Sequence, residues 1–96
     1  MNCSVRLDMV GKRFTTTVEG KECYLQFRQI SPQVFDFNYI QVHENLRERG
    51  IASTLVHNAL LFAQKEHIQI IPGCDFVQRY MEKHPEFRCV AWMEAV

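Results

Sequence analysis

The spacing of the apolar residues changes at Ile51, and this change constrains the fold most. From Ile51 onward they recur at intervals of three and four, which is the spacing of a helix with one buried face. The residues that follow this pattern are Ile51, Ala52, Leu55, Val56, Ala59, Phe62 and Ala63. The pattern predicts a long helix that begins at Ile51 and ends near His67.

The chain before this helix is typical of strands. Residues 13–19 are rich in Thr, Phe and Val, residues 19–21 include a glycine suited to a turn, and residues 23–30 place apolar side chains on one face. These segments predict a hairpin. Ser31 and Pro32 then break the chain, and the aromatic and β-branched residues 34–42 predict a third strand.

Shorter elements are expected after the helix. Residues 68–71 predict a strand that ends at Pro72 and Gly73. Residues 76–83 predict a short helix that ends before Pro85, and residues 88–92 could form a last strand or a coil. The order predicts an α+β fold with a mainly antiparallel sheet and one strand-helix-strand crossover. A chain of 96 residues has room for one core, so we expect a single domain over residues 1–96.

The charge balance and the start of the chain limit the possible partners. Eleven basic and eleven acidic side chains cancel, so no global field draws the protein to nucleic acid or to a membrane. Arg6 and Asp8 lie where a signal peptide would need apolar residues, and no apolar run is long enough to span a bilayer. We therefore expect a cytoplasmic protein.

Four cysteines, at positions 3, 23, 74 and 89, form no CxxC pair. Without a secretory signal, reduced thiols are expected. A zinc site built from Cys74, His84 and Cys89 is the alternative, but this spacing fits no familiar ligand pattern. We expect no metal.

The segment before the long helix is suited to an anion. Arg47 and Arg49 supply positive charge, Gly50 lets a phosphate approach the backbone, and Ala52 keeps the first helical turn thin. Local chemistry alone leaves open a second interpretation, in which these residues form a solvated loop.

The order of these residues resembles a known signature. Arg47-x-x-Gly50-x-Ala52 is similar to the Q/R-x-x-G-x-G/A motif with which the GNAT superfamily of N-acetyltransferases holds the pyrophosphate of coenzyme A. Residues 70–77, followed by Tyr80 and by residues 83–87, resemble the short YjdJ-type branch of that superfamily. Together the similar segments cover residues 34–90.

This resemblance implies a minimal GNAT fold and a use for acetyl-CoA as co-substrate. The coenzyme would lie where the strands 34–42 and 68–71 diverge. Val42 would pair with the pantetheine through its backbone, and the loop would hold the phosphates. The loop residues implied are Arg47, Glu48, Arg49, Gly50, Ile51 and Ala52. The acetyl group would pass to a small-molecule or peptide amine, directly or through a protein thiol.

Two residues are implied as catalysts. Cys74 matches a cysteine that the branch carries near the sulfur of the coenzyme, and a helix that begins near Phe76 favours its thiolate form. Tyr80 matches a tyrosine that protonates the leaving thiolate in larger GNAT enzymes. The alternatives are a small buried residue in a turn for Cys74 and half-buried packing for Tyr80.

The chain also departs from the branch. The pattern D-x-x-H-T-x-V-P is replaced by residues 36–43, in which Tyr39 takes the place of the histidine and His43 follows a few residues later. Glu48 stands where relatives often carry glycine. His57, His67 and His84 are interpreted as surface or capping residues.

Three functions are compatible with the sequence. The first is an acetyl-CoA-dependent N-acetyltransferase. The second is a non-catalytic module that binds acyl-CoA, which the missing histidine favours. In the third, Trp92, Met93 and the apolar tail make a contact between proteins and the loop binds nothing. The protein is expected to be a monomer or a weak homodimer.

Overall fold

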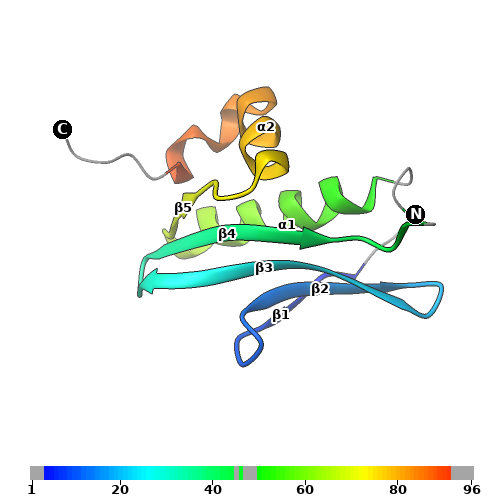
Figure 1. Ribbon diagram of the computed structural model, residues 1–96. Coiled ribbons are helices and arrows are strands. Elements are labelled where there is room, and N and C mark those ends of the chain that lie inside the picture. The colour runs from blue at the N-terminus through cyan, green and yellow to red at the C-terminus, as the bar shows by residue number, and fades with distance from the viewer. Residues whose placement is uncertain (1–3, 45, 47–49, 92–96) are drawn as a thin grey trace.

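A computed structural model describes residues 4–44, 46 and 50–91 of the chain. In these residues a sheet of five strands, in the order β1-β2-β3-β4-β5, has the long helix α1 packed against one face (Figure 1). The elements are β1 (Arg6–Asp8), β2 (Arg13–Val18), β3 (Lys21–Ser31), β4 (Val34–Gln41), α1 (Ile51–Glu66), β5 (Gln69–Ile71), α2 (Asp75–Lys83) and the 3-10 helix η2 (Pro85–Val90). No helix among the described residues is long and apolar enough to cross a membrane.

The sheet topology confirms the predicted α+β fold. Strands β1 to β4 pair antiparallel in sequence order, and β5 pairs parallel with β4 after the crossover through α1. The hairpin between β2 and β3 turns at Glu19 and Gly20, whose φ angles of 51° and 76° are both positive. Two positive φ angles match the right-handed twist of a hairpin, and glycine adopts one of them without strain.

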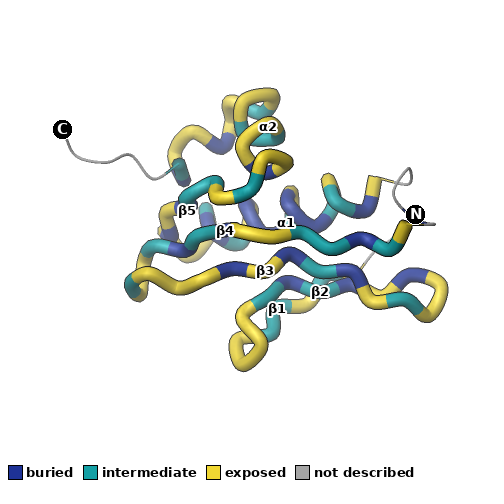
Figure 2. Tube along the Cα trace, viewed as in Figure 1, coloured by how far each residue is buried: buried dark blue, intermediate teal, exposed yellow. Residues whose placement is uncertain are grey.

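The core lies between α1 and the sheet. The buried face of α1 is marked by Ile51, Leu55 and Val56, and Figure 2 shows the buried turns of this helix facing the strands. Opposite them, Phe27 stacks on Phe35 with their ring centroids 4.6 Å apart. The helix ends at His67, whose φ of 57° is left-handed and whose backbone N–H bonds to carbonyls of the last turn. The capping role predicted for His67 is confirmed.

Two parts of the chain differ from the sequence predictions. Strand β1 was not predicted, and it pairs with β2 after a turn in which Asp8 Oδ1 accepts the N–H of Gly11 at 2.9 Å. No strand forms over residues 88–91, because Pro85 starts the 3-10 helix η2 with its fixed φ. Only Ala91 makes an isolated bridge, to Ile70.

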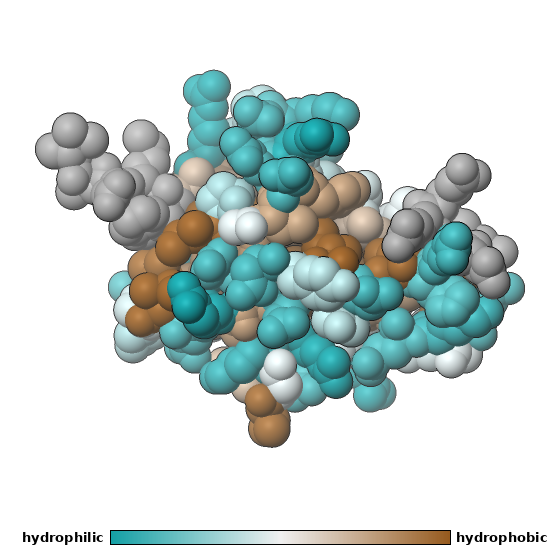
Figure 3. Space-filling model, in the orientation of Figure 1, coloured by the Kyte–Doolittle hydropathy of each residue, from teal (hydrophilic) through white to brown (hydrophobic). Residues whose placement is uncertain are grey.

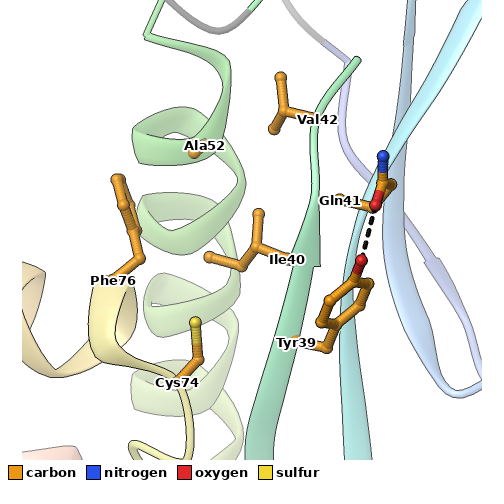
Figure 4. A pocket seen from close by; sticks show the side chains of 7 residues that line it. All are labelled: Tyr39, Ile40, Gln41, Val42, Ala52, Cys74 and Phe76. Atoms are coloured by element: carbon orange, nitrogen blue, oxygen red, sulfur yellow. Dashed lines mark hydrogen bonds between the residues drawn. The ribbon is translucent and has the colours of Figure 1, made fainter. Parts of the chain in front are cut away.

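A β-bulge in β4 sets the direction of the side chains that follow it. Phe27 pairs with Phe37, but Gln26 pairs with Tyr39, so Asn38 is an extra residue in β4. A bulge shifts the alternation of side chains by one position. As a result, Ile40 points toward α1, whereas Tyr39 points to the other face of the sheet (Figure 4).

Candidate functional site

The parallel pairing of β4 with β5 stops early. It extends from Val34 and Gln69 to Asp36 and Ile71, whereas β4 continues to Gln41. Beyond Asp36, no described strand pairs with this edge of β4. Backbone N–H and C=O groups on an open strand edge can pair with another chain. The pairing stops because β5 ends at Ile71, so the open edge of β4 follows from the short length of β5, and no part of β5 diverges from β4.

A pocket of about 480 Å³ lies along this open edge (Figure 4). It is lined by Tyr39, Ile40, Gln41, Val42, Ala52, Cys74 and Phe76. The space-filling view shows an apolar band between α2 and β4 (Figure 3). We call this space the edge pocket. It brings together three of the predicted site residues, namely Val42, Ala52 and Cys74.

Cys74 reaches the edge pocket from the turn between β5 and α2. It is the N-cap residue of α2, with φ of −124° and ψ of 139°, and its side chain is partly buried against the core. Figure 4 shows its sulfur pointing into the space between α2 and β4. A thiol at this position is accessible to a ligand that lies along the strand edge.

The predicted phosphate loop is described only from Gly50 onward. Arg47, Glu48 and Arg49 lie outside the described residues. Gly50 is the N-cap of α1, with a left-handed φ of 72°, and apart from its chain neighbours no described residue has a heavy atom within 4 Å of where a Cβ at this position would lie. The first turn of α1 contains no acidic residue, and no side chain of the described residues caps it. Its N–H groups are therefore open to an anion.

Ile51 and Ala52 follow Gly50 in different settings. The side chain of Ile51 is fully buried in the core, so only its backbone can contact a ligand. Ala52 is partly buried and lines the edge pocket. The small side chain of Ala52 leaves room between α1 and the strand edge.

Tyr80 belongs to a cluster of rings on the outer side of α1. A hydrogen bond of 3.0 Å joins Tyr80 Oη to His57 Nδ1. The ring of Tyr80 stacks on His84, with centroids 3.9 Å apart and an angle of 14° between the planes. His84 Nδ1 donates to the backbone carbonyl of Tyr80 at 2.7 Å, and the backbone N–H of His84 caps α2. The capping role predicted for His84 is confirmed.

The pKa of Tyr80 is raised by burial and, to a smaller extent, by the negative charge of Glu86. A raised pKa keeps the phenol protonated at neutral pH, as a general acid requires. The contact of Tyr80 with His57 could not be read from the sequence, since the two residues are 23 positions apart.

The two candidate catalysts face different pockets. Tyr80 lines a second cavity of about 410 Å³ between α1 and α2, which we call the helix pocket. Cys74 does not line it, and Phe76 is a wall of both cavities. Tyr80 therefore does not share a pocket with Cys74.

The candidate bases also take separate positions. Tyr39, in the place of the histidine of the branch, is 48% exposed and its Oη donates to Gln41 Oε1 at 2.7 Å. His43 is partly buried just after β4.

Among the described residues, no group of three or more metal-binding side chains gathers. Cys89, from the alternative zinc set, instead contacts Gln64 Nε2 at 3.4 Å.

Comparison with known proteins decides the family. A family model described as GCN5-related N-acetyl-transferase matches residues 13–90. This chain belongs to that family. The resemblance to the GNAT superfamily seen in Arg47, Gly50 and Ala52 is thus confirmed, and the match extends further toward the N-terminus than the residues that first indicated it.

The relatives of this GNAT domain include proteins from vertebrates. Protein NATD1 of Homo sapiens is 26% identical over 87 residues, which cover 86% of this chain and 77% of the human protein. Protein NATD1 of Gallus gallus is also 26% identical over 87 residues, covering 86% and 79%. The NMR structure of a GCN5-like protein from Staphylococcus aureus superposes with a TM-score of 0.72 at 15% identity, covering 96% of this chain and 90% of that chain. At this identity the structural likeness shows the fold.

Proposed function

We propose that this GNAT domain binds acetyl-CoA along the open edge of β4 and transfers the acetyl group to an amine. The observation that carries the proposal is the edge pocket, which joins an unpaired strand edge, the first turn of α1 and the thiol of Cys74. Membership of the N-acetyltransferase family supports the same reaction.

The walls of the edge pocket fit the parts of coenzyme A. The first turn of α1, which no described side chain caps, and the space above Gly50 suit the pyrophosphate. The open edge of β4 suits the amides of the pantetheine arm, because they can continue the ladder of the sheet. Ile40 and Val42 offer apolar contacts to the methylene groups of this arm.

The reaction would proceed at the thioester, whose carbonyl carbon accepts the amine nitrogen while the bond to sulfur breaks. In the direct route, β4 and α1 orient the thioester and the amine attacks it. In the relayed route, Cys74 Sγ first takes the acetyl group and the amine then removes it, which restores the thiol. Tyr80 would protonate the leaving thiolate through a bridging water, because it lies in the neighbouring pocket.

An acylation assay tests this proposal. Purified protein is incubated with acetyl-CoA and a panel of polyamines, amino acids and peptides, and release of free coenzyme A thiol is followed together with the mass of each amine. We expect amine-dependent release. Loss of transfer in Cys74→Ala but not in Cys89→Ala would establish the relayed route, and full activity in both variants would establish the direct one.

A non-catalytic acyl-CoA-binding module is the second candidate. It is favoured by the lining of the edge pocket, in which no described residue is His, Asp or Glu, and by the bond that ties Tyr39 to Gln41. Tight binding of acetyl-CoA without transfer to any amine in the panel would select this function. Absence of binding would exclude both candidates.

A further inference from the structure

His57 is an exposed residue of α1, yet contacts with α2 and η2 fix its side chain. Its ring packs edge-on against Phe87, which is 1% exposed, with centroids 5.7 Å apart and an angle of 76° between the planes. It also meets the ring of Tyr80 at 68°, with centroids 6.5 Å apart. Two rings from different elements therefore set the plane of the imidazole, whose Nδ1 lies 3.0 Å from Tyr80 Oη.

The direction of this hydrogen bond determines what Tyr80 can do. A phenolic hydroxyl has one proton to donate, and its oxygen can also accept. If Tyr80 donated to His57, its proton would be engaged and could not reach a leaving thiolate. If His57 Nδ1–H donates instead, Tyr80 Oη accepts and keeps its own proton for another acceptor.

The surroundings of both side chains suit the second direction. His57 is exposed, so water can donate to its Nε2 in the tautomer that carries the proton on Nδ1. His84 does not compete for Tyr80 Oη, because its ring lies flat on the ring of Tyr80 and its Nδ1 binds the backbone carbonyl of that residue. The phenolic proton is then free to point into the helix pocket, which Tyr80 lines.

A donor to Tyr80 Oη also favours the loss of the phenolic proton. When Tyr80 acts as an acid through the bridging water, its O–H bond breaks, an S–H bond forms on coenzyme A, and negative charge remains on Oη. The bond from Nδ1–H to this phenolate is charge-assisted, so it is stronger than the bond to the neutral phenol. Water then returns a proton to Tyr80, and solvent takes the proton that the amine nitrogen gives up.

We propose that His57 is a positioning residue for Tyr80: its Nδ1–H donates to Tyr80 Oη, turns the phenolic proton toward the leaving thiolate and stabilises the phenolate that forms. This inference rests on the proposed function, in which Tyr80 protonates that thiolate. It gives a role in the reaction to a histidine that the sequence indicated only as a surface or capping residue.

Steady-state kinetics test this role, with acetyl-CoA and the amine of the acylation panel that is acetylated fastest. His57 lines neither cavity, so His57→Ala should lower kcat about tenfold and leave the KM for acetyl-CoA within about twofold. His57→Asn should recover most of kcat, because its amide N–H can take the place of Nδ1–H. In a Tyr80→Phe background, His57→Ala should change kcat by less than about twofold, since no hydroxyl is left to position.

Lys65→Ala is the matched control. Lys65 is an exposed residue eight positions after His57 on α1, a distance of about 12 Å along the axis. This variant should keep the wild-type kcat. Urea denaturation of each variant shows that the protein assayed is folded.

Nitrogen NMR supplies a readout that does not depend on turnover. At a pH of about 8.5, where histidine is neutral, the ¹⁵N shifts of His57 should show a proton on Nδ1 and none on Nε2. A proton on Nε2, or the same loss of kcat with and without the hydroxyl of Tyr80, would overturn the role of His57 while the proposed function stands. If the wild type acetylates no amine of the panel, the proposed function fails, and the role of His57 fails with it.

Discussion

Gly73 packs directly against the carboxylate of Asp36, in contact so close that a Cβ on residue 73 would overlap Asp36 Oδ1. Asp36 is the last residue of β4 that pairs with β5, and its Oδ1 is buried without a hydrogen-bond partner among the described residues. Gly73 directly precedes Cys74. The carboxylate and the glycine thus fix where the chain leaves the sheet and where the thiol begins α2.

The variant Gly73→Ala should therefore lower the free energy of unfolding by about 1–3 kcal/mol, because the added methyl has no space. Urea denaturation measures this effect. In an Asp36→Ala background the carboxylate is gone, and the cost of Gly73→Ala should drop below about 0.5 kcal/mol. If the cost is equal in both backgrounds, the overlap with Asp36 does not determine the choice of glycine.

Two variants of Gly50 can separate the effect of backbone strain on stability from the effect of a blocked site on ligand binding. Its φ of 72° is one that asparagine adopts readily and valine does not. Gly50→Val should lose about 1–2 kcal/mol of stability, whereas Gly50→Asn should lose little. Both variants fill the space above the helix start, so both should weaken coenzyme A binding about tenfold or more in calorimetry. Normal coenzyme A binding by folded Gly50→Asn would contradict the placement of a phosphate at this position.

The cysteines should differ in their reaction with iodoacetamide. Cys23 is fully buried and should react slowly, whereas Cys89 is exposed and Cys74 lies in the edge pocket. Accessibility alone makes Cys89 reactive, so the informative quantity is protection by coenzyme A. Peptide mapping after brief alkylation should show Cys74 protected and Cys89 unaffected. Equal protection of both thiols, or of neither, would contradict the placement of the ligand beside Cys74.

We expect Tyr80 to make the free energy of unfolding fall as the pH rises in the alkaline range. Its pKa in the folded protein is raised above 10.0, so the folded state holds the phenolic proton more tightly than the unfolded chain does. The resulting stabilisation is present below pH 10 and is lost as pH rises through the folded pKa. Denaturation at several pH values from 8 to 11 should show a shallower decline above pH 10 in Tyr80→Phe than in the wild type. If stability declines equally steeply with pH in both proteins, Tyr80 is not the origin of the pH dependence.

Elements with a repeated pattern could be predicted from the sequence. Helix α1 begins at Ile51 as predicted, because its apolar residues keep the helical period over 16 residues. Strand β1 was missed because three residues are too few to show a period, although the spacing of Asp8 and Gly11 is a turn signal that could have indicated it. Residues 88–91 were ambiguous because so short a segment shows no clear period, and in the structure they follow or lie in the 3-10 helix that Pro85 starts.

The sequence predicted single members of the site better than their grouping. Gly50, Ala52 and Cys74 could be proposed as site residues because each lies in a local motif next to an element boundary. The contact between His57 and Tyr80 depends on how α1 and α2 cross, and no local pattern carries that information. For the same reason the sequence did not indicate that Cys74 and Tyr80 line different cavities.

The open edge of β4 also bears on self-association of the protein. An unpaired strand edge is a template for the strands of other molecules and promotes aggregation. Here α2 runs beside the open segment, and Cys74 and Phe76 project from its N-terminus next to Ile40. A second sheet approaching this edge would collide with these side chains, whereas a thin flexible chain would pass between them. We therefore expect the side chains that shape the pocket also to hinder two copies of the sheet from joining at this edge.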